Sequence, residues 1–104
     1  MYEFWRLSSK SKIAVYSLEF TNQYLKVLKL ARKRNLDEEK LNLVIRILIA
    51  GEIVPPQYKD HRLTGEYKGL YECHLLPDWL LIYSKNKTIK LITLIRTGTH
   101  SDLF

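Results

Sequence analysis

The stretch GLYECHLLPDWLLIYSKNKTIKLITLIR, residues 69–96, decides the fold. It contains three runs rich in aliphatic, β-branched and aromatic residues, at 69–76, 79–84 and 88–96. Two short turn segments, 77–78 and 85–87, separate them. Runs of this composition bounded by turn residues predict β-strands, and such short turns pair them antiparallel. The third run is apolar on both faces, which predicts a central strand.

Upstream of this stretch, residues 12–20 (KIAVYSLEF) predict another strand. From Phe20 the apolar residues recur at helical spacing, and this helix ends at residues 32–35, where cations and an asparagine are typical of a helix C-terminus. Asp37 is a good N-cap for a second helix, whose apolar stripe ends at Gly51. The stripe consists of Leu41, Val44, Ile45, Leu48 and Ile49. We therefore predict an α+β fold, with an N-terminal strand and a two-helix hairpin packed on an antiparallel sheet of about four strands.

The overall composition is that of an ordinary globular domain. Of 104 residues, 46% are hydrophobic and 27% charged, and we predict one domain over residues 13–104 after an N-terminal extension, residues 1–12. No apolar run approaches the roughly 18 residues of a membrane span, so we expect no membrane partner. The first residues do not resemble a signal peptide, and the single cysteine, Cys73, cannot form an internal disulfide. We expect a cytoplasmic protein.

Basic residues outnumber acidic ones, 17 to 11, which gives a net charge of +6 beside seven tyrosines and two tryptophans. Positive charge with aromatic rings suits RNA, because cations meet phosphates while rings stack on bases. It would equally suit an acidic protein partner. The first predicted helix carries a basic group that is either an RNA-docking surface or a solvated face. Its members are Lys26, Lys29, Arg32, Lys33 and Arg34.

All three histidines lie in the second half of the chain, together with one carboxylate and one guanidinium that follow predicted strands. These residues are His61, His74, Asp78, Arg96 and His100. Each has an ordinary structural explanation as a loop, strand or turn residue. Together they suit phosphoryl transfer on RNA, in which a base takes a proton, an acid gives one and a cation stabilises the phosphorane.

A metal site requires ligands at suitable spacing, and the sequence does not offer it. His74 and Asp78 are four residues apart, but Pro77 between them argues against a helix there. No zinc-finger or HExxH spacing is present either. We expect neither a metal nor a cofactor.

Two segments carry a resemblance to a known family: YKDHRLTGEYKGLYECHLLPDWLLIY (58–83) and LIRTGTHSDLF (94–104). They resemble the YafQ branch of the RelE/ParE toxins of bacterial type II toxin–antitoxin systems, and the resemblance covers about residues 13–104. It implies a ribosome-dependent, metal-independent endoribonuclease that cuts mRNA in the vacant A site of the 70S ribosome. It also implies an antitoxin of the RelB/DinJ type that blocks the toxin, with operator DNA contacted only through the toxin–antitoxin complex.

Carried over by position, the resemblance implies a catalytic group of six residues: His61, His74, Asp78, Arg96, His100 and Phe104. Arg96 would stabilise the phosphorane, His100 act as acid and His61 as base, and Phe104 position a base of the RNA. His74 and Asp78 would orient these groups. Contacts to substrate or ribosome would come from Trp79, Lys59, Lys68 and the basic group of the first helix.

Two other functions stay open at this point. A toxin of the ParE type shares the fold but inhibits DNA gyrase, and such an inhibitor needs no proton-transfer residues, so the histidines argue against it. The second is a non-catalytic co-repressor that only binds its antitoxin. That function predicts no toxicity when the protein is expressed alone.

Overall fold

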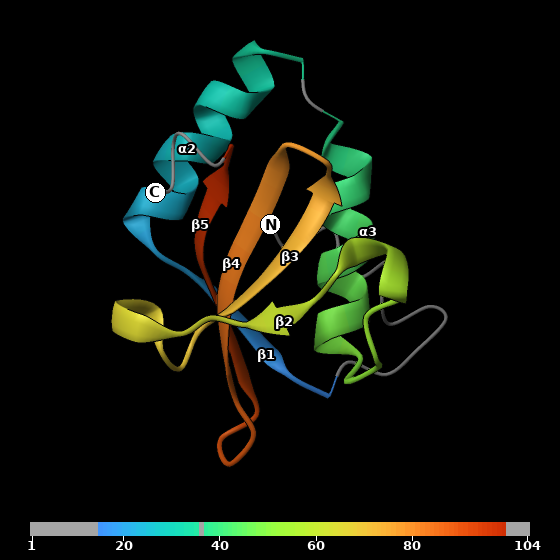
Figure 1. Cartoon of the computed structure of the whole chain (residues 1–104), viewed down its shortest axis with the longest axis vertical. Helices are drawn as coiled ribbons and strands as arrows, with labels where there is room; N and C mark the ends of the chain where they lie inside the picture. Colours follow the sequence, from blue (N-terminus) through green and yellow to red (C-terminus); the bar gives the residue numbers. More distant parts are fainter. Residues whose placement is uncertain (1–14, 36, 100–104) are drawn as a thin grey trace.

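In the part of the chain that the structure describes, five strands form one mixed sheet and two helices cover one of its faces (Figure 1). The structure is a computed structural model that describes residues 15–35 and 37–99. The strand order across the sheet is β1-β5-β4-β3-β2. The elements are β1 (Ser17–Phe20), α2 (Asn22–Lys33), α3 (Glu38–Ile49), η1 (Pro56–Tyr58), β2 (His61–Arg62), η2 (Gly65–Tyr67), β3 (Tyr71–Leu76), β4 (Trp79–Asn86) and β5 (Leu91–Gly98). The predicted α+β architecture is confirmed.

The sheet differs from the prediction in the direction of its first strand. β1 pairs parallel with β5, from Ser17 opposite Leu91 to Phe20 opposite Leu94, whereas the other neighbours are antiparallel. A parallel pair requires a long crossover connection, and the chain between β1 and β5 includes both helices. Phe20, where the predicted strand over 12–20 meets the helical pattern, ends β1 and stacks on Tyr24 with ring centroids 5.5 Å apart.

The helix boundaries follow the capping signals. Thr21 caps α2: its Oγ1 accepts a hydrogen bond from the Tyr24 amide at 3.0 Å and donates to the Ile95 carbonyl at 2.6 Å, which ties the helix to β5. Asp37 caps α3, where its Oδ1 accepts from the Glu39 amide at 3.0 Å. Within the part of the chain that the structure describes, neither helix is long and apolar enough to cross a membrane.

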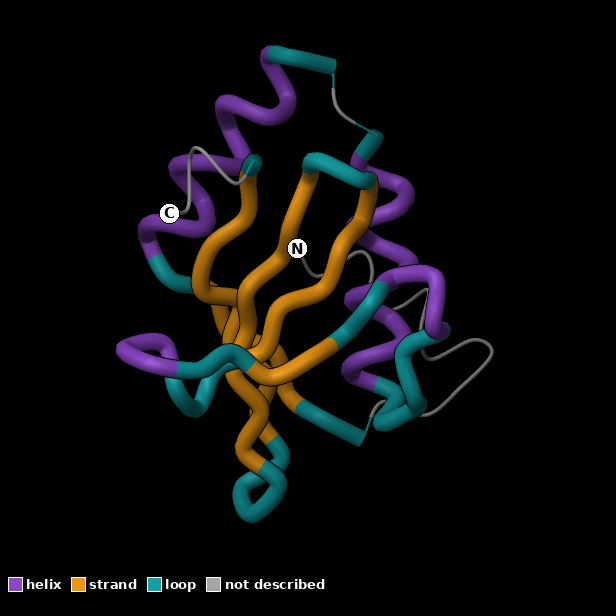
Figure 2. The backbone as a smooth tube through the Cα atoms, viewed as in Figure 1, coloured by secondary structure: helices purple, strands orange, loops and turns teal. Residues whose placement is uncertain are grey.

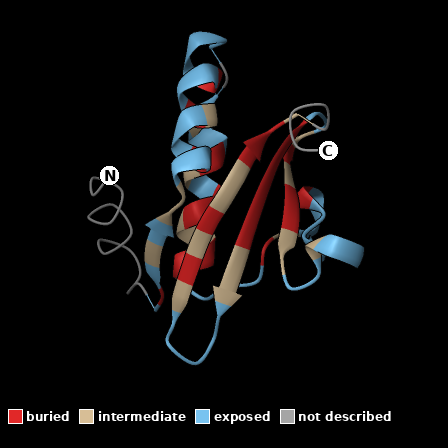
Figure 3. Cartoon of the chain, turned by 90° about the vertical axis from the view of Figure 1, so that its left-hand side faces the viewer, coloured by how far each residue is buried: buried red, intermediate tan, exposed pale blue. Residues whose placement is uncertain are grey.

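The sheet has one covered face and one open face. On the covered face, Trp79, Leu81 and Tyr83 of β4 pack into a core shared with α2 and α3. The predicted α3 stripe is fully buried there. The alternate β4 residues Leu80 and Ile82 point to the other face, into a smaller apolar cluster that lies away from the helices. Figure 3 shows the buried residues of the strands with the helical layer to one side only.

Burial of three acidic protons makes the fold sensitive to alkaline pH. Burial raises the pKa of Tyr24, Tyr83 and Cys73 above their ordinary values, with carboxylates adding to each shift. A raised pKa in the folded state stabilises the fold fully below the unfolded pKa, and this stability is lost as pH rises above it. We expect the free energy of unfolding to fall above about pH 9, by up to about 1.4 kcal/mol per pH unit for each group. Urea titrations between pH 7 and 11 measure it, and the slope should be smaller in Tyr83→Phe; an unchanged slope in this variant would contradict the contribution of Tyr83.

Candidate active site

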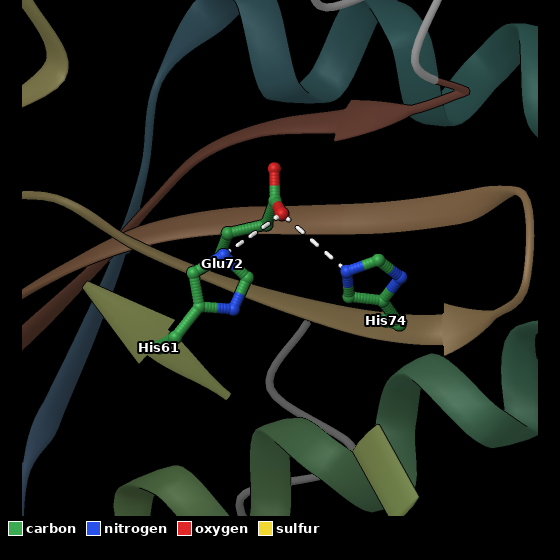
Figure 4. A group of neighbouring side chains, drawn as sticks. All are labelled: His61, Glu72 and His74. Atoms are coloured by element: carbon green, nitrogen blue, oxygen red, sulfur yellow. Dashed lines mark ion pairs between the residues drawn. The ribbon is translucent and has the colours of Figure 1, made fainter. Parts of the chain in front are cut away.

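Two histidines and a glutamate converge on the open face of the sheet (Figure 4). His61 of β2 lies opposite Glu72 of β3 in the strand register, and His74 follows Glu72 by two residues on the same face. The Glu72 Oε1 lies 3.3 Å from His61 Nε2 and 3.4 Å from His74 Nε2. Glu72 is only 5% exposed, so a buried carboxylate stands between two more accessible imidazoles.

The ring of His61 is held at its other nitrogen. Nδ1 lies 2.7 Å from the Lys59 carbonyl oxygen. Because a carbonyl can only accept, Nδ1 carries the hydrogen, and the lone pair of the neutral ring is on Nε2, facing Glu72. Lys59 adopts the left-handed conformation, φ 48°, where η1 ends, and this turn leads directly into β2. Figure 2 shows β2 as a short strand between the helical turns η1 and η2.

The segment before His61 is anchored to the core by the buried side chain of Tyr58 and by a hydrogen bond to Asp60. The hydroxyl of Tyr83 in β4 donates to Asp60 Oδ1. The Tyr83 ring also stacks on Tyr71, with centroids 5.3 Å apart. β2 consists of two exposed residues, so these anchors position a strand that has little packing of its own.

Arg96 lies in the same row of the sheet as His61 and Glu72. It is opposite Ile82 in β4, Ile82 is opposite Glu72, and Glu72 is opposite His61. Two strand spacings, roughly 10 Å, therefore separate the backbones of Arg96 and Glu72. The β4–β5 register shifts beside Arg96, and the β3–β4 register shifts beside His74. Bulges of this kind turn side chains out of the regular pleat and are common next to active sites.

The remaining predicted site residues are distributed as follows. Asp78 is exposed in the β3–β4 turn, at the end of the sheet where β5 also ends (Figure 1). Gly98 lies opposite Leu80, which lies opposite His74, so β5 ends in the row of His74. Lys59 and Lys68 are exposed. His100 and Phe104 lie outside the described residues.

Trp79 does not have the position expected of an RNA contact. Its side chain is 2% exposed, and its Nε1 donates to Thr97 Oγ1 at 2.8 Å. Thr97 in turn donates to the Leu80 carbonyl at 2.8 Å. The expected role of Trp79 in binding substrate or ribosome is therefore corrected. The Trp79 side chain packs in the core, and its hydrogen bond to Thr97 links β4 to the end of β5.

The predicted basic group of the first helix is exposed on α2 along its whole length. Lys26, Lys29 and Arg32 border a groove between α2 and α3 with a volume of about 1120 Å³. Arg32 is bonded to Glu38 through two contacts, at 2.7 and 3.1 Å, so part of its charge is neutralised. The group thus lies on the helical side, and its last member, Arg34, lines a second pocket together with Arg96 of β5.

Glu72 is the site residue that the sequence analysis missed. Its position two residues before His74 on a predicted strand was the available signal, since period two places both on one face. The missing information was the partner strand: residues 57–69 carry no strand pattern in the sequence, and only the pairing of β2 with β3 in three dimensions brings His61 to Glu72.

Comparison with known proteins matches most of the chain to one family. The model of the family described as "Bacterial toxin of type II toxin-antitoxin system, YafQ" matches residues 16–104. An Escherichia coli K12 relative, "mRNA interferase toxin YafQ", is 46% identical over 88 residues, covering 84% of this chain and 94% of the relative. In the crystal structure of the Escherichia coli DinJ–YafQ toxin–antitoxin complex, a chain of 43% identity matches with a TM-score of 0.80, covering 86% of this chain and 98% of that one. A metal-bound toxin from Helicobacter pylori matches at 38% identity and a TM-score of 0.80, covering 86% and 99%.

Two helices on one face of such a sheet, matched by solved toxin structures with TM-scores of 0.80 and 0.81, place the chain in the class of small bacterial toxins of the RelE type. The particular family follows from the matches. The chain belongs to the YafQ family of toxins of type II toxin–antitoxin systems.

Proposed function

We propose that this toxin cuts mRNA in the ribosomal A site by metal-independent acid–base catalysis. The general activity comes from the family: relatives 43–46% identical to the chain are mRNA interferases, a class of endoribonuclease. The observation that carries the site is the pair of imidazoles on one buried carboxylate, 3.3 and 3.4 Å away. Histidine suits both proton roles because its ordinary pKa is about 6.5.

The reaction is an attack of a 2′-hydroxyl on the adjacent 3′-phosphate. His61 Nε2 takes the hydroxyl proton, the 2′ oxygen bonds to phosphorus, and the bond to the 5′ oxygen of the next nucleotide breaks. His100 gives a proton to this leaving oxygen, which leaves a 2′,3′-cyclic phosphate and a 5′-hydroxyl. Arg96 stabilises the charge of the phosphorane. Asp78 and His74 orient the proton-transfer groups, and Phe104 stacks on a base.

Glu72 adds a role for a residue with no part in the sequence-based mechanism. When His61 takes the proton, Nε2 becomes the charged side of an imidazolium, and the Glu72 oxygen is already 3.3 Å away. A fixed negative charge at the place where positive charge develops lowers the barrier, because the protein need not reorganise during the step.

The partners follow from the two faces of the molecule. The open face carries the chemistry and would meet mRNA in the A site, while the basic α2 surface, of Lys26, Lys29, Arg32, Lys33 and Arg34, would contact ribosomal RNA. We propose an antitoxin of the DinJ type as the inhibitor, because the Escherichia coli YafQ with 43% identity is seen in complex with DinJ. Operator DNA would be reached only through that complex, and the site of action would be the cytoplasm.

The test is primer extension on a defined mRNA in a purified translation system. Wild-type toxin should produce cuts within A-site codons, and cuts should be absent without ribosomes and with His100→Ala. Cuts that occur equally on free mRNA would overturn ribosome dependence. Growth arrest without any cuts would favour gyrase inhibition, and expression without toxicity would favour the co-repressor.

Charge reversal on α2 tests the ribosome contact. We expect Lys26→Glu with Lys29→Glu to weaken ribosome binding at least tenfold in low salt and to reduce the salt slope by about two, because two phosphate contacts are lost. Binding is measured by co-sedimentation at several salt concentrations. Lys40→Glu with Lys87→Glu, two exposed lysines on other elements, is the matched control. Equal losses in both pairs would show a general charge effect and no docking surface.

A further inference from the structure

We propose that Arg34, at the end of α2, and Arg96 of β5 together bind the mRNA phosphate next to the one that is cut. This inference rests on the proposed function, in which Arg96 stabilises the phosphorane. It assigns Arg34 to the mRNA strand, as a residue that positions the substrate. The contact with ribosomal RNA is then left to the other members of the basic α2 surface.

The structure divides the basic residues of α2 between two different surfaces. Lys26, Lys29 and Arg32 border the groove with α3, whereas Arg34 lines a smaller pocket beside the end of β5. Helical spacing explains this division, because residues three or four positions apart share one face of a helix. The α2 face that lines the smaller pocket consists of Gln23, Val27, Leu30, Ala31 and Arg34. Among these residues only Arg34 carries a charge.

The position of Arg34 is set by the end of the helix. Its backbone N–H is shared between the Leu30 and Ala31 carbonyls, at 3.2 and 3.1 Å. Such three-centre hydrogen bonds are common at helix termini. The Arg34 side chain is exposed. A fixed backbone with an exposed guanidinium allows a ligand to be bound without rearrangement of the helix.

The pocket lies at the edge of the sheet where β5 extends past its neighbour. β1 pairs with β5 only as far as Leu94, and α2 lies alongside the β5 residues that follow (Figure 1). The hydrogen bond from Thr21 Oγ1 to the Ile95 carbonyl, at 2.6 Å, holds the start of α2 against β5 at this point. In the described part of the chain, α2 is therefore the element next to Arg96 on the side away from β4.

Arg96 links this pocket to the proposed cleavage site. It shares a row of the sheet with His61 and Glu72, and it also lines the pocket with Arg34. The order across the molecule is thus the histidine–glutamate cluster, then Arg96, then Arg34. An RNA strand whose reacting phosphate lies between His61 and Arg96 would direct a neighbouring phosphate toward Arg34.

The lining and the size of the pocket suit a phosphate. Two guanidinium groups border it, together with the polar side chains of Gln23 and Thr99, and none of the described residues that line it is acidic. Its volume is about 240 Å³, below the roughly 300–1,000 Å³ of sites that enclose a whole small molecule. Arginine binds phosphate through two parallel N–H donors and has five in all, so Arg96 can contact the reacting phosphate and its neighbour at once.

The cleavage test pairs a change in the protein with a change in the RNA. In single-turnover cleavage of end-labelled, ribosome-bound mRNA, Arg34→Gln should raise the toxin concentration for half-maximal cleavage at least about fivefold. The rate at saturation should stay nearly unchanged, because the lost contact binds substrate and transition state equally. A neutral methylphosphonate at one of the two phosphates that flank the reacting one should cause the same loss in the wild type. The two changes together should cost no more than either alone.

Two further variants control this result. Arg34→Lys keeps the charge but not the paired donors, so it should lie between Arg34→Gln and the wild type. Lys40→Gln removes one exposed charge from α3 and should cut as the wild type does. An equal loss in Lys40→Gln, or no loss in Arg34→Gln, would overturn the proposal. Additive losses from Arg34→Gln and the methylphosphonate would also overturn it, since Arg34 would then act on another group, such as ribosomal RNA.

A binding test without ribosomes separates this pocket from the proposed function. The probe is a 2′-O-methylated trinucleotide, which carries two phosphodiesters and cannot be cut because its 2′ oxygens are blocked. In NMR spectra of the full chain, the Nε–H signals of Arg34 and Arg96 should shift together, and Arg34→Gln should weaken binding at least about fivefold. A shift of Arg96 alone, or of neither signal, would overturn the pocket. Binding at both arginines with no cutting on ribosomes would overturn the proposed function and leave the pocket standing.

Discussion

His61→Ala is expected to lower single-turnover cleavage about 10²–10⁴-fold and to remove the limb of the pH–rate profile in which the rate rises with pH. The reason is that a general base must be deprotonated to act, and His61 presents Nε2 on the open face, fixed by the 2.7 Å contact of Nδ1 with the Lys59 carbonyl. His100→Ala should remove the opposite limb, since an acid must be protonated. Both profiles are measured with ribosome-bound mRNA and excess toxin.

The matched control for these variants is Glu66→Gln, an exposed change in η2 that should preserve both limbs. Circular dichroism and thermal unfolding should show that His61→Ala folds, because His61 is exposed in a two-residue strand. Survival of both limbs in either histidine variant would show that the assigned roles are wrong. Loss of the same limb in both would mean that acid and base are not this pair.

Glu72→Gln is the second change with a large expected effect. We expect about a 10²-fold loss of cleavage, comparable to removal of one preorganised electrostatic group. The amide keeps the shape of the side chain but loses the charge that faces both imidazoles at 3.3 and 3.4 Å. Single-turnover rates measured at saturating toxin separate this chemical loss from weaker ribosome binding.

Glu72→Asp provides the companion to that test. The aspartate keeps the negative charge, but its side chain is one methylene shorter, so the carboxylate lies farther from the two imidazoles. We expect the cleavage rate of Glu72→Asp to lie between those of Glu72→Gln and the wild type. If Gln and wild type cut at equal rates, Glu72 is a structural residue that only holds the histidine rings. If Asp is as slow as Gln, position matters as much as charge.

Much of the fold could be predicted because its signals are local. Asp37 and the α3 stripe, from Leu41 to Ile49, gave the second helix its start and its buried face, and the turns at 77–78 and 85–87 gave the hairpins. The parallel pairing of β1 with β5 could not be predicted. It joins two segments that lie at opposite ends of the described chain, and no local sequence pattern indicates such a long-range pairing. β2 was not predicted because it consists of two exposed residues, which are too few to show the alternation of buried and exposed side chains that indicates a strand.

The site was predictable only in part, for the same reason. His61 and His74 were recognised by residue type and resemblance, but their shared carboxylate depends on a cross-strand register that a loop-like sequence conceals. Trp79 shows the opposite error: a tryptophan beside a catalytic motif suggested a contact with RNA, while its burial and its bond to Thr97 show that it packs the core. His100 and Phe104 remain predictions, outside the described residues.

The tether between His61 Nδ1 and the Lys59 carbonyl has a consequence for turnover. Many catalytic histidines can receive a proton at one nitrogen and release it at the other, passing it through the ring. In His61, Nδ1 already donates its hydrogen to the Lys59 carbonyl, so a proton accepted at Nε2 has to leave from Nε2 as well. In the proposed mechanism the proton therefore stays on Nε2, beside Glu72, while the product is bound, and we expect a second round of cutting only after the product has left.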